Sequence, residues 1–308
     1  MERKGIFIED TFAEAFPMSA VRLIITADTE RWALEAARSM TGFATSVIAC
    51  GCEGAIESHL KPDETPDGRY GISVMLFAMS SSQLKKHVIN RCGQCVMTAP
   101  TSALFSGFSQ APESSPKDKV KDKVPVGAAL RYFGDGWQIS KRLGERRYWR
   151  IPVMDGEFLC EDHTWRREAI GGGNFLILAE SRRAALTAAS HAVEAIRGLP
   201  SVILPFPGGV VRSGSKVGSK YKSLIASTNG AFCPTLRGLI PSSLPANVAS
   251  VMEIVINGLG RAPIEKAMAQ GMNAVIRLGR KGGIVGLSAG NYGGKLGPHH
   301  FSLREILT

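Results

Sequence analysis

The fold prediction starts from the stretch NFLILAESRRAALTAASHAVEAIRGLPSVILPF at residues 174–206. It opens with an apolar run at 174–178, which is typical of a buried strand. Small and branched apolar residues then recur at the spacing of one helical face: Ala185, Ala188, Ala189, Ala192 and Ile196. Gly198 ends this pattern, and the apolar run at 201–206 is a second strand candidate. The stretch therefore predicts a strand, a helix and a second strand.

The same pattern occurs earlier in the chain, in RLIITADTERWALEAARSMTGFATSVIA at residues 22–49. Residues 27–37 and 179–189 are identical at six of eleven positions, with a constant offset of 152 residues. The apolar face of the earlier helix comprises Ala33, Ala36, Ala37 and Met40. TSVIA at 45–49 is the predicted second strand of this copy. Alanine-rich helices match easily, so the repeat needs support from the rest of each half.

Each half contains a second pair of strands around a helical pattern. In the first half, SVMLFAM at 73–79 is followed by a helix and by a strand near 94–99. In the second half, SVMEIVI at 250–256 is followed by a helix and by a strand at 284–288. Each half therefore has the order β-α-β-β-α-β, which gives an antiparallel sheet with helices on one face.

We predict an α+β protein with two ferredoxin-like lobes that arose by internal duplication. The N-terminal lobe is predicted at 1–150 and the C-terminal lobe at 151–308. SQAPESSPKDKVKDKVP at 109–125 has the polar, proline-containing composition of an exposed loop. The aromatic-rich stretch 126–170 is predicted to form short strands that extend or bridge the lobes.

The composition predicts a soluble protein with a large core. The chain has 308 residues, of which 44% are apolar, and no apolar run approaches the roughly 20 residues that cross a bilayer. The N-terminus MERKGIFIEDTF lacks the apolar segment of a signal peptide, so we expect a cytoplasmic protein. The formal net charge of +10 is partly clustered at 141–150. Such a charge favours an anionic partner, for which nucleic acid, a membrane surface and an acidic small molecule are candidates.

Six cysteines are distributed along the chain, and we expect reduced thiols because a core of this size needs no disulfides. Cys92 and Cys95 form a CxxC motif, but no second close pair has zinc spacing, and the predicted helix ends rather than begins there. His299 and His300 have no carboxylate or cysteine neighbours at ligand spacing. No metal or redox site is therefore predicted.

Glu253 is the residue whose position most strongly indicates chemistry. It lies in the otherwise apolar VMEIVI, at the position where the first copy has Leu76. A carboxyl group on a buried strand costs several kcal/mol unless it is paired or protonated. Burial raises the pKa of a carboxyl, which suits it to general acid or base catalysis near neutral pH. The alternative is a side chain that faces water on the open side of an antiparallel sheet.

A Gly-, Ser- and Lys-rich loop follows the strand candidate at 201–206. It reads PFPGGVVRSGSKVGSKYKSLIASTN at 205–229 and offers backbone N–H groups and ammonium groups to an anion or a developing oxyanion. Its GSKVGSK segment lacks the spacing of a Walker loop, and GGGNF at 171–175 precedes a strand, unlike a dinucleotide-binding motif. The alternative is a flexible surface loop without a ligand.

Eleven motifs follow one another along the chain: IEDTFAEAF at 8–16, TGFATSVI at 41–48, TPDGR at 65–69, GQCVMTAPTS at 93–102, FGDG at 133–136, GGNF at 172–175, PFPGG at 205–209, SKVGSK at 215–220, ASTN at 226–229, EIVINGL at 253–259 and SAGNYGGKLG at 288–297. Together they resemble the formylmethanofuran–tetrahydromethanopterin formyltransferase family, with a collinear match from residue 8 nearly to the end. The resemblance implies two ferredoxin-like lobes, assembly into oligomers, and no metal or tightly bound cofactor.

The resemblance also implies the reaction and its site. A formyl group would move between tetrahydromethanopterin and the amine of a methanofuran-type carrier, both acting as co-substrates. Both carriers are anionic and the furan carrier bears glutamates, so we expect them to be the partners of the positive charge. The family's acidic active-site residue falls on Glu253. The residues expected to bind the carriers are Ser215, Lys216, Ser219, Lys220, Gln94, Asn229, Asn291 and Lys295.

The basic composition resembles the bacterial members of the family. In those, the transferase is a subunit of a formyltransferase/hydrolase complex, and flux runs from the pterin toward formate. We therefore expect a homo-oligomer or a complex subunit, without a nucleic-acid or membrane partner. Two other classes stay open from the residues alone. One is a tandem RNA-binding protein, although the strands lack the aromatic residues that stack bases, and the other is a non-catalytic scaffold subunit.

Overall fold

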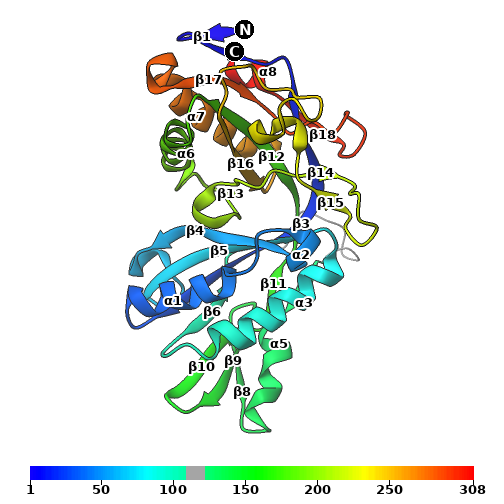
Figure 1. Cartoon of the computed structure of the whole chain (residues 1–308). Coiled ribbons are helices and arrows are strands. Elements are labelled where there is room, and N and C mark those ends of the chain that lie inside the picture. The colour runs from blue at the N-terminus through cyan, green and yellow to red at the C-terminus, as the bar shows by residue number, and fades with distance from the viewer. Residues whose placement is uncertain (109–121) are drawn as a thin grey trace. The chain divides into compact units, whose positions relative to one another are not determined.

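The computed structural model describes residues 1–108 and 122–308, and within them the chain forms two compact mixed α/β units (Figure 1). One unit comprises residues 18–169, and the other comprises residues 1–17 together with 170–308. Each unit has its own set of strands, its own helices and its own buried apolar core.

The unit of residues 18–169 contains strands in the order β4-β5-β3-β6, and every neighbouring pair among them is antiparallel. β10 pairs in parallel with β6, and β9 and β8 continue the sheet from there. The elements from β3 to β11 are β3 (Phe12–Ala27), α1 (Glu30–Thr41), α2 (Val47–Cys50), β4 (Glu53–Leu60), η1 (Pro62–Glu64), β5 (Tyr70–Ala78), α3 (Ser81–Arg91), η2 (Cys92–Val96), β6 (Ala103–Ser106), β7 (Lys123–Pro125), α5 (Gly127–Leu130), η3 (Arg131–Gly134), β8 (Ile139–Leu143), β9 (Arg146–Val153), β10 (Gly156–Glu161) and β11 (His163–Trp165).

The unit that contains residues 170–308 has strands in the order β17-β12-β16-β13, again with antiparallel neighbours, and β2 pairs in parallel with β17. The remaining elements are β1 (Glu2–Arg3), β2 (Ile6–Ile8), β12 (Arg167–Ala179), α6 (Arg182–Ile196), β13 (Val202–Ile203), η4 (Pro207–Gly209), β14 (Lys216–Val217), β15 (Ala226–Ser227), η5 (Gly230–Phe232), η6 (Pro234–Leu236), β16 (Ser250–Gly258), α7 (Arg261–Leu278), η7 (Arg280–Gly282), β17 (Ile284–Ser288), β18 (His299–Ser302) and α8 (Leu303–Leu307).

The division between the units differs from the predicted lobes of 1–150 and 151–308. Residues 1–17 join the C-terminal part of the chain because β2 pairs with β17 and the first residues of β3 pair with β18. Residues 151–169 stay with the N-terminal part because β9 and β10 extend the sheet that contains β6.

Side-chain caps begin the two helices that the repeat predicted. Thr29 accepts a hydrogen bond from the Trp32 N–H at the start of α1, and Ser181 accepts one from the Ala184 N–H at the start of α6. Every predicted apolar-face residue of both helices is buried, which confirms the helical pattern. Gly42 follows the last residue of α1. None of the helices in the two described stretches is long and apolar enough to cross a membrane.

Two predicted strands of the first half are wrong. TSVIA at 45–49 largely forms the short helix α2, because the Ser46 hydroxyl accepts the Ile48 N–H and Gly51 ends the turn with a φ of 70°. The segment near 94–99 belongs to the π-helical turn η2 and the residues after it, and the strand β6 begins only at Ala103. In both places a local turn displaces the strand by several residues.

The predicted strand at 201–206 is reduced to the two residues of β13. Pro205 and Pro207 follow it, and proline has no N–H to donate to a neighbouring strand. The other predicted strands of this half, at 174–178, 250–256 and 284–288, are confirmed as β12, β16 and β17.

The predicted exposed loop at 109–125 lies mostly outside the described residues. Its described end differs from the prediction, because Asp122 and Val124 are buried. Asp122 pairs with Arg166, and β7 pairs with β11. The predicted short strands of 126–170 are present as β8 to β11 and the start of β12.

Helices α6 and α7 pack side by side against one face of the sheet that contains β16 (Figure 1). Ile254 and Ile256 of β16 belong to the same core as Ile264 and Met268 of α7. Successive side chains of a strand point to opposite faces, so Glu253 lies on the face away from these helices. The fold thus places this carboxyl where the segment after Val211 can cover it.

Candidate functional site

Glu253 is held between two neighbouring segments. On one side it lies opposite Leu176 of β12, and on the other its backbone exchanges hydrogen bonds of 2.9 and 2.8 Å with Val211. The residue is only 9% exposed. Glu253 therefore lies on the face opposite the helices, but it is covered and does not face open water.

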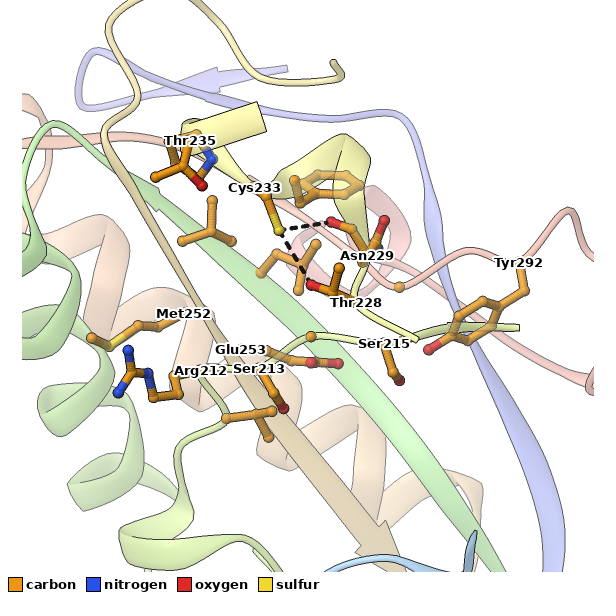
Figure 2. Close-up of a pocket in the computed structure, with 17 residues that line it drawn as sticks. Arg212, Ser213, Ser215, Thr228, Asn229, Cys233, Thr235, Met252, Glu253 and Tyr292 are labelled. Carbon is orange, nitrogen blue, oxygen red and sulfur yellow. Dashed lines mark hydrogen bonds between the residues drawn. The ribbon is translucent and has the colours of Figure 1, made fainter. Parts of the chain in front are cut away.

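A cavity of about 400 Å³ lies over this carboxyl (Figure 2). Five segments that are distant in the sequence converge on it, namely β12, β16, the loop after β13, the turns around η5 and η6, and the loop after β17. The polar residues on its lining are Arg212, Ser213, Ser215, Thr228, Asn229, Cys233, Thr235, Glu253 and Tyr292. Leu176, Val211, Phe232, Val251 and Met252 supply its apolar walls.

Burial raises the pKa of Glu253 from its ordinary value of 4.5 to about 7. Among the described residues nothing hydrogen-bonds to this carboxyl or forms an ion pair with it, so loss of water contact is the cause. A carboxyl with a pKa near neutrality exchanges its proton readily in both directions at physiological pH. The cavity therefore contains a group suited to general acid–base catalysis.

Tyr292 lines the same cavity and was not among the predicted site residues. Burial raises the pKa of its phenol, the negative charge of Glu253 raises it further, and a hydrogen bond with the Ser215 side chain partly opposes both. The phenol thus keeps its proton and can act as a hydrogen-bond donor. Figure 2 shows the Tyr292 ring and Ser215 on the same side of the site.

Arg212 was also missed by the sequence analysis, although it lies in the predicted loop at 205–229. Its side chain is on the cavity lining, and it has no acidic partner among the described residues. Thr228 and Cys233 complete one wall, where the Cys233 thiol lies 3.4 Å from the Thr228 hydroxyl. The sequence signal for Tyr292 was the motif SAGNYGGKLG at 288–297, because it places an aromatic residue within a glycine-rich loop.

The structure brings three of the predicted site residues together on the cavity lining: Glu253, Ser215 and Asn229. Asn291 lies in the loop after β17 but its side chain turns elsewhere, where its oxygen accepts the Gly293 N–H at 2.7 Å. The predicted carrier-binding role of these residues stays a prediction.

The other predicted residues do not line the cavity. Lys216, Lys220 and Lys295 are exposed outside it, and the Ser219 hydroxyl accepts the Tyr221 N–H at 3.0 Å. Gln94 is exposed on η2 of the other unit. Their roles toward the carriers are likewise untested.

Cys92 of the CxxC motif is completely buried, and its desolvation holds the pKa of the thiol far above the ordinary value. A thiol in this state is a poor nucleophile and a poor metal ligand. In residues 1–108 and 122–308, no group of three or more His, Cys, Asp or Glu side chains has the arrangement of a metal site.

Comparisons with known proteins assign this architecture to one family. The family model described as formylmethanofuran-tetrahydromethanopterin formyltransferase matches residues 1–153, and the model of the proximal lobe of the same family matches 156–306. The formylmethanofuran–tetrahydromethanopterin formyltransferase of Methylococcus capsulatus is 60% identical over 304 residues, which cover 99% of both chains. The two family models meet close to the predicted boundary at 150/151.

Two solved structures are similar over the whole chain. The first is the formyltransferase/hydrolase complex FhcABCD of Methylorubrum extorquens with methylofuran, with a TM-score of 0.94 and 49% identity over 100% of this chain and 99% of that one. The second is the formylmethanofuran:tetrahydromethanopterin formyltransferase of Methanosarcina barkeri, with a TM-score of 0.90 and 45% identity over 99% and 100%. In sequence, one subunit of the Methylorubrum extorquens complex is 49% identical to this chain over 309 residues.

Proposed function

The chain belongs to the formylmethanofuran–tetrahydromethanopterin formyltransferase family and is a formyltransferase of one-carbon metabolism, and from this premise we propose how its cavity carries out the transfer. The formyl group moves between a nitrogen of tetrahydromethanopterin and the amine of a methanofuran-type carrier. The observation that supports the mechanism is the buried carboxyl of Glu253 on the cavity lining.

The proton balance of the reaction assigns a role to this carboxyl. When the acceptor nitrogen attacks the formyl carbon, the carbonyl oxygen becomes an oxyanion and the attacking nitrogen has a proton to lose. When the carbon–nitrogen bond to the donor breaks, the leaving nitrogen must gain a proton. Protonated Glu253 donates to the leaving nitrogen, and its carboxylate then takes the proton of the attacking nitrogen. A pKa of about 7 lets one side chain perform both transfers.

The carriers would be held by the polar and basic residues around the cavity. We propose that Ser215 and Asn229 bind them directly, and that Arg212 on the cavity lining pairs with a carrier carboxylate or phosphate. Lys216, Lys220 and Lys295 would attract the anionic carriers from outside the cavity. The proposed roles of Ser219, Asn291 and Gln94 rest on the family resemblance alone, as does the proposal that the carriers are co-substrates and no cofactor is tightly bound.

We also propose how the chain assembles with other subunits and how its two lobes arose. The similarity to a subunit of the Methylorubrum extorquens complex supports a chain that works within a formyltransferase/hydrolase complex or a homo-oligomer, with net flux toward formate.

The strand orders β6-β3-β5-β4 and β17-β12-β16-β13 agree when each set is numbered along its own chain segment. This agreement supports two ferredoxin-like lobes that arose by duplication.

A transfer assay with both purified carriers tests the proposal. Glu253→Gln should fold normally and lose about 10²–10⁴-fold in transfer rate, the usual contribution of a general acid–base group. Glu9→Gln, which changes an exposed carboxyl of the same unit, is the control and should keep the wild-type rate. Full activity of Glu253→Gln would remove the acid–base role, whereas absence of transfer by the wild-type chain would leave only the scaffold alternative.

A further inference from the structure

Glu14 is a charged side chain that the proposed mechanism does not use, and it is completely buried. Its carboxylate accepts four backbone hydrogen bonds from the loop after β17: from Tyr292 at 2.9 Å, from Gly294 at 3.0 Å, from Gly297 at 2.7 Å and from Leu296. Burial alone raises the pKa of this carboxyl, but the four N–H donors outweigh burial and hold the pKa below its ordinary value. Glu14 is therefore an internal anion around which the loop is wrapped.

Other contacts fix the same loop at its two ends. The Gly290 N–H donates to the Asn174 side-chain oxygen at 2.6 Å, and the Gly290 carbonyl accepts the Glu14 N–H at 3.2 Å. At the far end, a Cβ on Gly297 would lie 2.3 Å from the Ala15 carbonyl oxygen, so only glycine fits this close approach. The backbone on both sides of Tyr292 is thus held against β3 and β12.

The packing of the apolar core does not explain these contacts of Glu14, Gly290 and Gly297. Burying a carboxylate is costly unless it is fully hydrogen-bonded, and here it orders a loop whose Asn291, Lys295 and Leu296 side chains are exposed. Tyr292 is the side chain of this loop that lines the cavity (Figure 2). The evident consequence of the contacts that hold this loop is a fixed position for the Tyr292 ring.

Tyr292 and Ser215 both line the cavity (Figure 2). The Ser215 hydroxyl can donate to the phenol oxygen, which leaves the phenol proton free for another acceptor. Glu253 borders the same cavity and interacts electrostatically with this phenol. A reacting group placed against Glu253 would therefore share this cavity with the phenol.

We propose that Tyr292 is a catalytic residue whose hydroxyl donates a hydrogen bond to the formyl oxygen as it becomes an oxyanion, and that Glu14 is the positioning residue that holds it there. The inference rests on the proposed formyl transfer and adds no proton to its balance, because the phenol keeps its proton throughout. Negative charge develops on the formyl oxygen only in the tetrahedral state, so a prepositioned donor lowers the barrier more than it strengthens substrate binding.

Tyr292→Phe tests the first part in the transfer assay with both carriers. It should lower kcat about 100-fold with KM changed by less than about threefold, as expected when one oxyanion donor is removed. The control is Tyr221→Phe, an exposed tyrosine of the neighbouring loop, which should keep wild-type values. A kcat for Tyr292→Phe within about threefold of wild type overturns the role of Tyr292. Glu253→Gln is measured alongside, so a failure of Tyr292 leaves the acid–base role separately decided.

A double-mutant cycle tests the second part. Glu14→Gln places amide hydrogens against two of the N–H donors, and it should lower kcat nearly as much as Tyr292→Phe does. Because both changes would remove one interaction, the double variant should be no slower than Tyr292→Phe alone. Losses that multiply would overturn the positioning role, since they would show that Glu14 acts independently of Tyr292. If Glu14→Gln does not fold, Glu14→Asp, which keeps the charge on a shorter side chain, takes its place in the same cycle with the same two outcomes.

Discussion

Replacing Glu253 with glutamine should stabilise the fold at alkaline pH while leaving its stability almost unchanged in acid. The pKa of Glu253 is raised from 4.5 to about 7 in the folded chain, so the folded state keeps a proton that the unfolded chain has already released. Stability from this group is fully present below about pH 4.5 and is lost as pH rises through about 7. One pKa unit corresponds to about 1.4 kcal/mol, so the loss amounts to about 3 kcal/mol. Glutamine has no titrating proton, so the Glu253→Gln variant does not lose this stability as pH rises.

Urea unfolding of the wild type and Glu253→Gln at about pH 4 and about pH 8.5 measures this difference. The stability gain of the variant should grow by about 3 kcal/mol between the two pH values. Comparing the two proteins at each pH cancels the other titrating groups. Glu9→Gln, at an exposed position, serves as the control and should show no such growth. A growth below about 1 kcal/mol for Glu253→Gln would refute the burial of an uncompensated carboxyl.

Four other substitutions test the cations of the proposed carrier-binding region, the loop after β17 and the CxxC motif. Arg212→Ala should raise KM for the anionic carriers about tenfold and flatten its salt dependence, with a smaller effect from Lys216→Ala, because only the arginine lines the cavity. Gly297→Ala should lower the unfolding free energy in urea by about 1–3 kcal/mol, because its Cβ meets the Ala15 carbonyl oxygen at 2.3 Å. Cys92→Ala should keep the wild-type transfer rate, and in the native protein the buried Cys92 thiol should resist a thiol reagent until the chain unfolds.

The helices were predictable because their apolar faces have a spacing that only a helix satisfies. The alanine face of α6 and the matching face of α1 became buried as the pattern indicated. The strands at 45–49 and 94–99 were not predictable in this way. Their apolar residues are compatible with a strand, but the Ser46 cap and the hydrogen bond from the Met97 N–H to the Cys92 carbonyl select helical turns.

The site residues also differ in whether they could be predicted from the sequence. Glu253 could be found from the sequence because the repeat sets it against Leu76 in a run of apolar residues. The role of Glu14 could not, because it bonds to a loop 278 or more residues away, and only the folded chain brings them together. The charge of Lys216 and Lys220 predicted that they bind the carriers, yet the cation on the cavity lining is Arg212.

Infrared difference spectroscopy between the wild type and Glu253→Gln can follow the carboxyl itself. The C=O band of a protonated carboxyl belongs to Glu253 alone in such a difference, and its loss with rising pH gives the pKa of that side chain. We expect the band to persist at about pH 6 and to disappear with a midpoint near 7. A midpoint near the ordinary 4.5 would contradict a Glu253 that holds its proton for the formyl transfer.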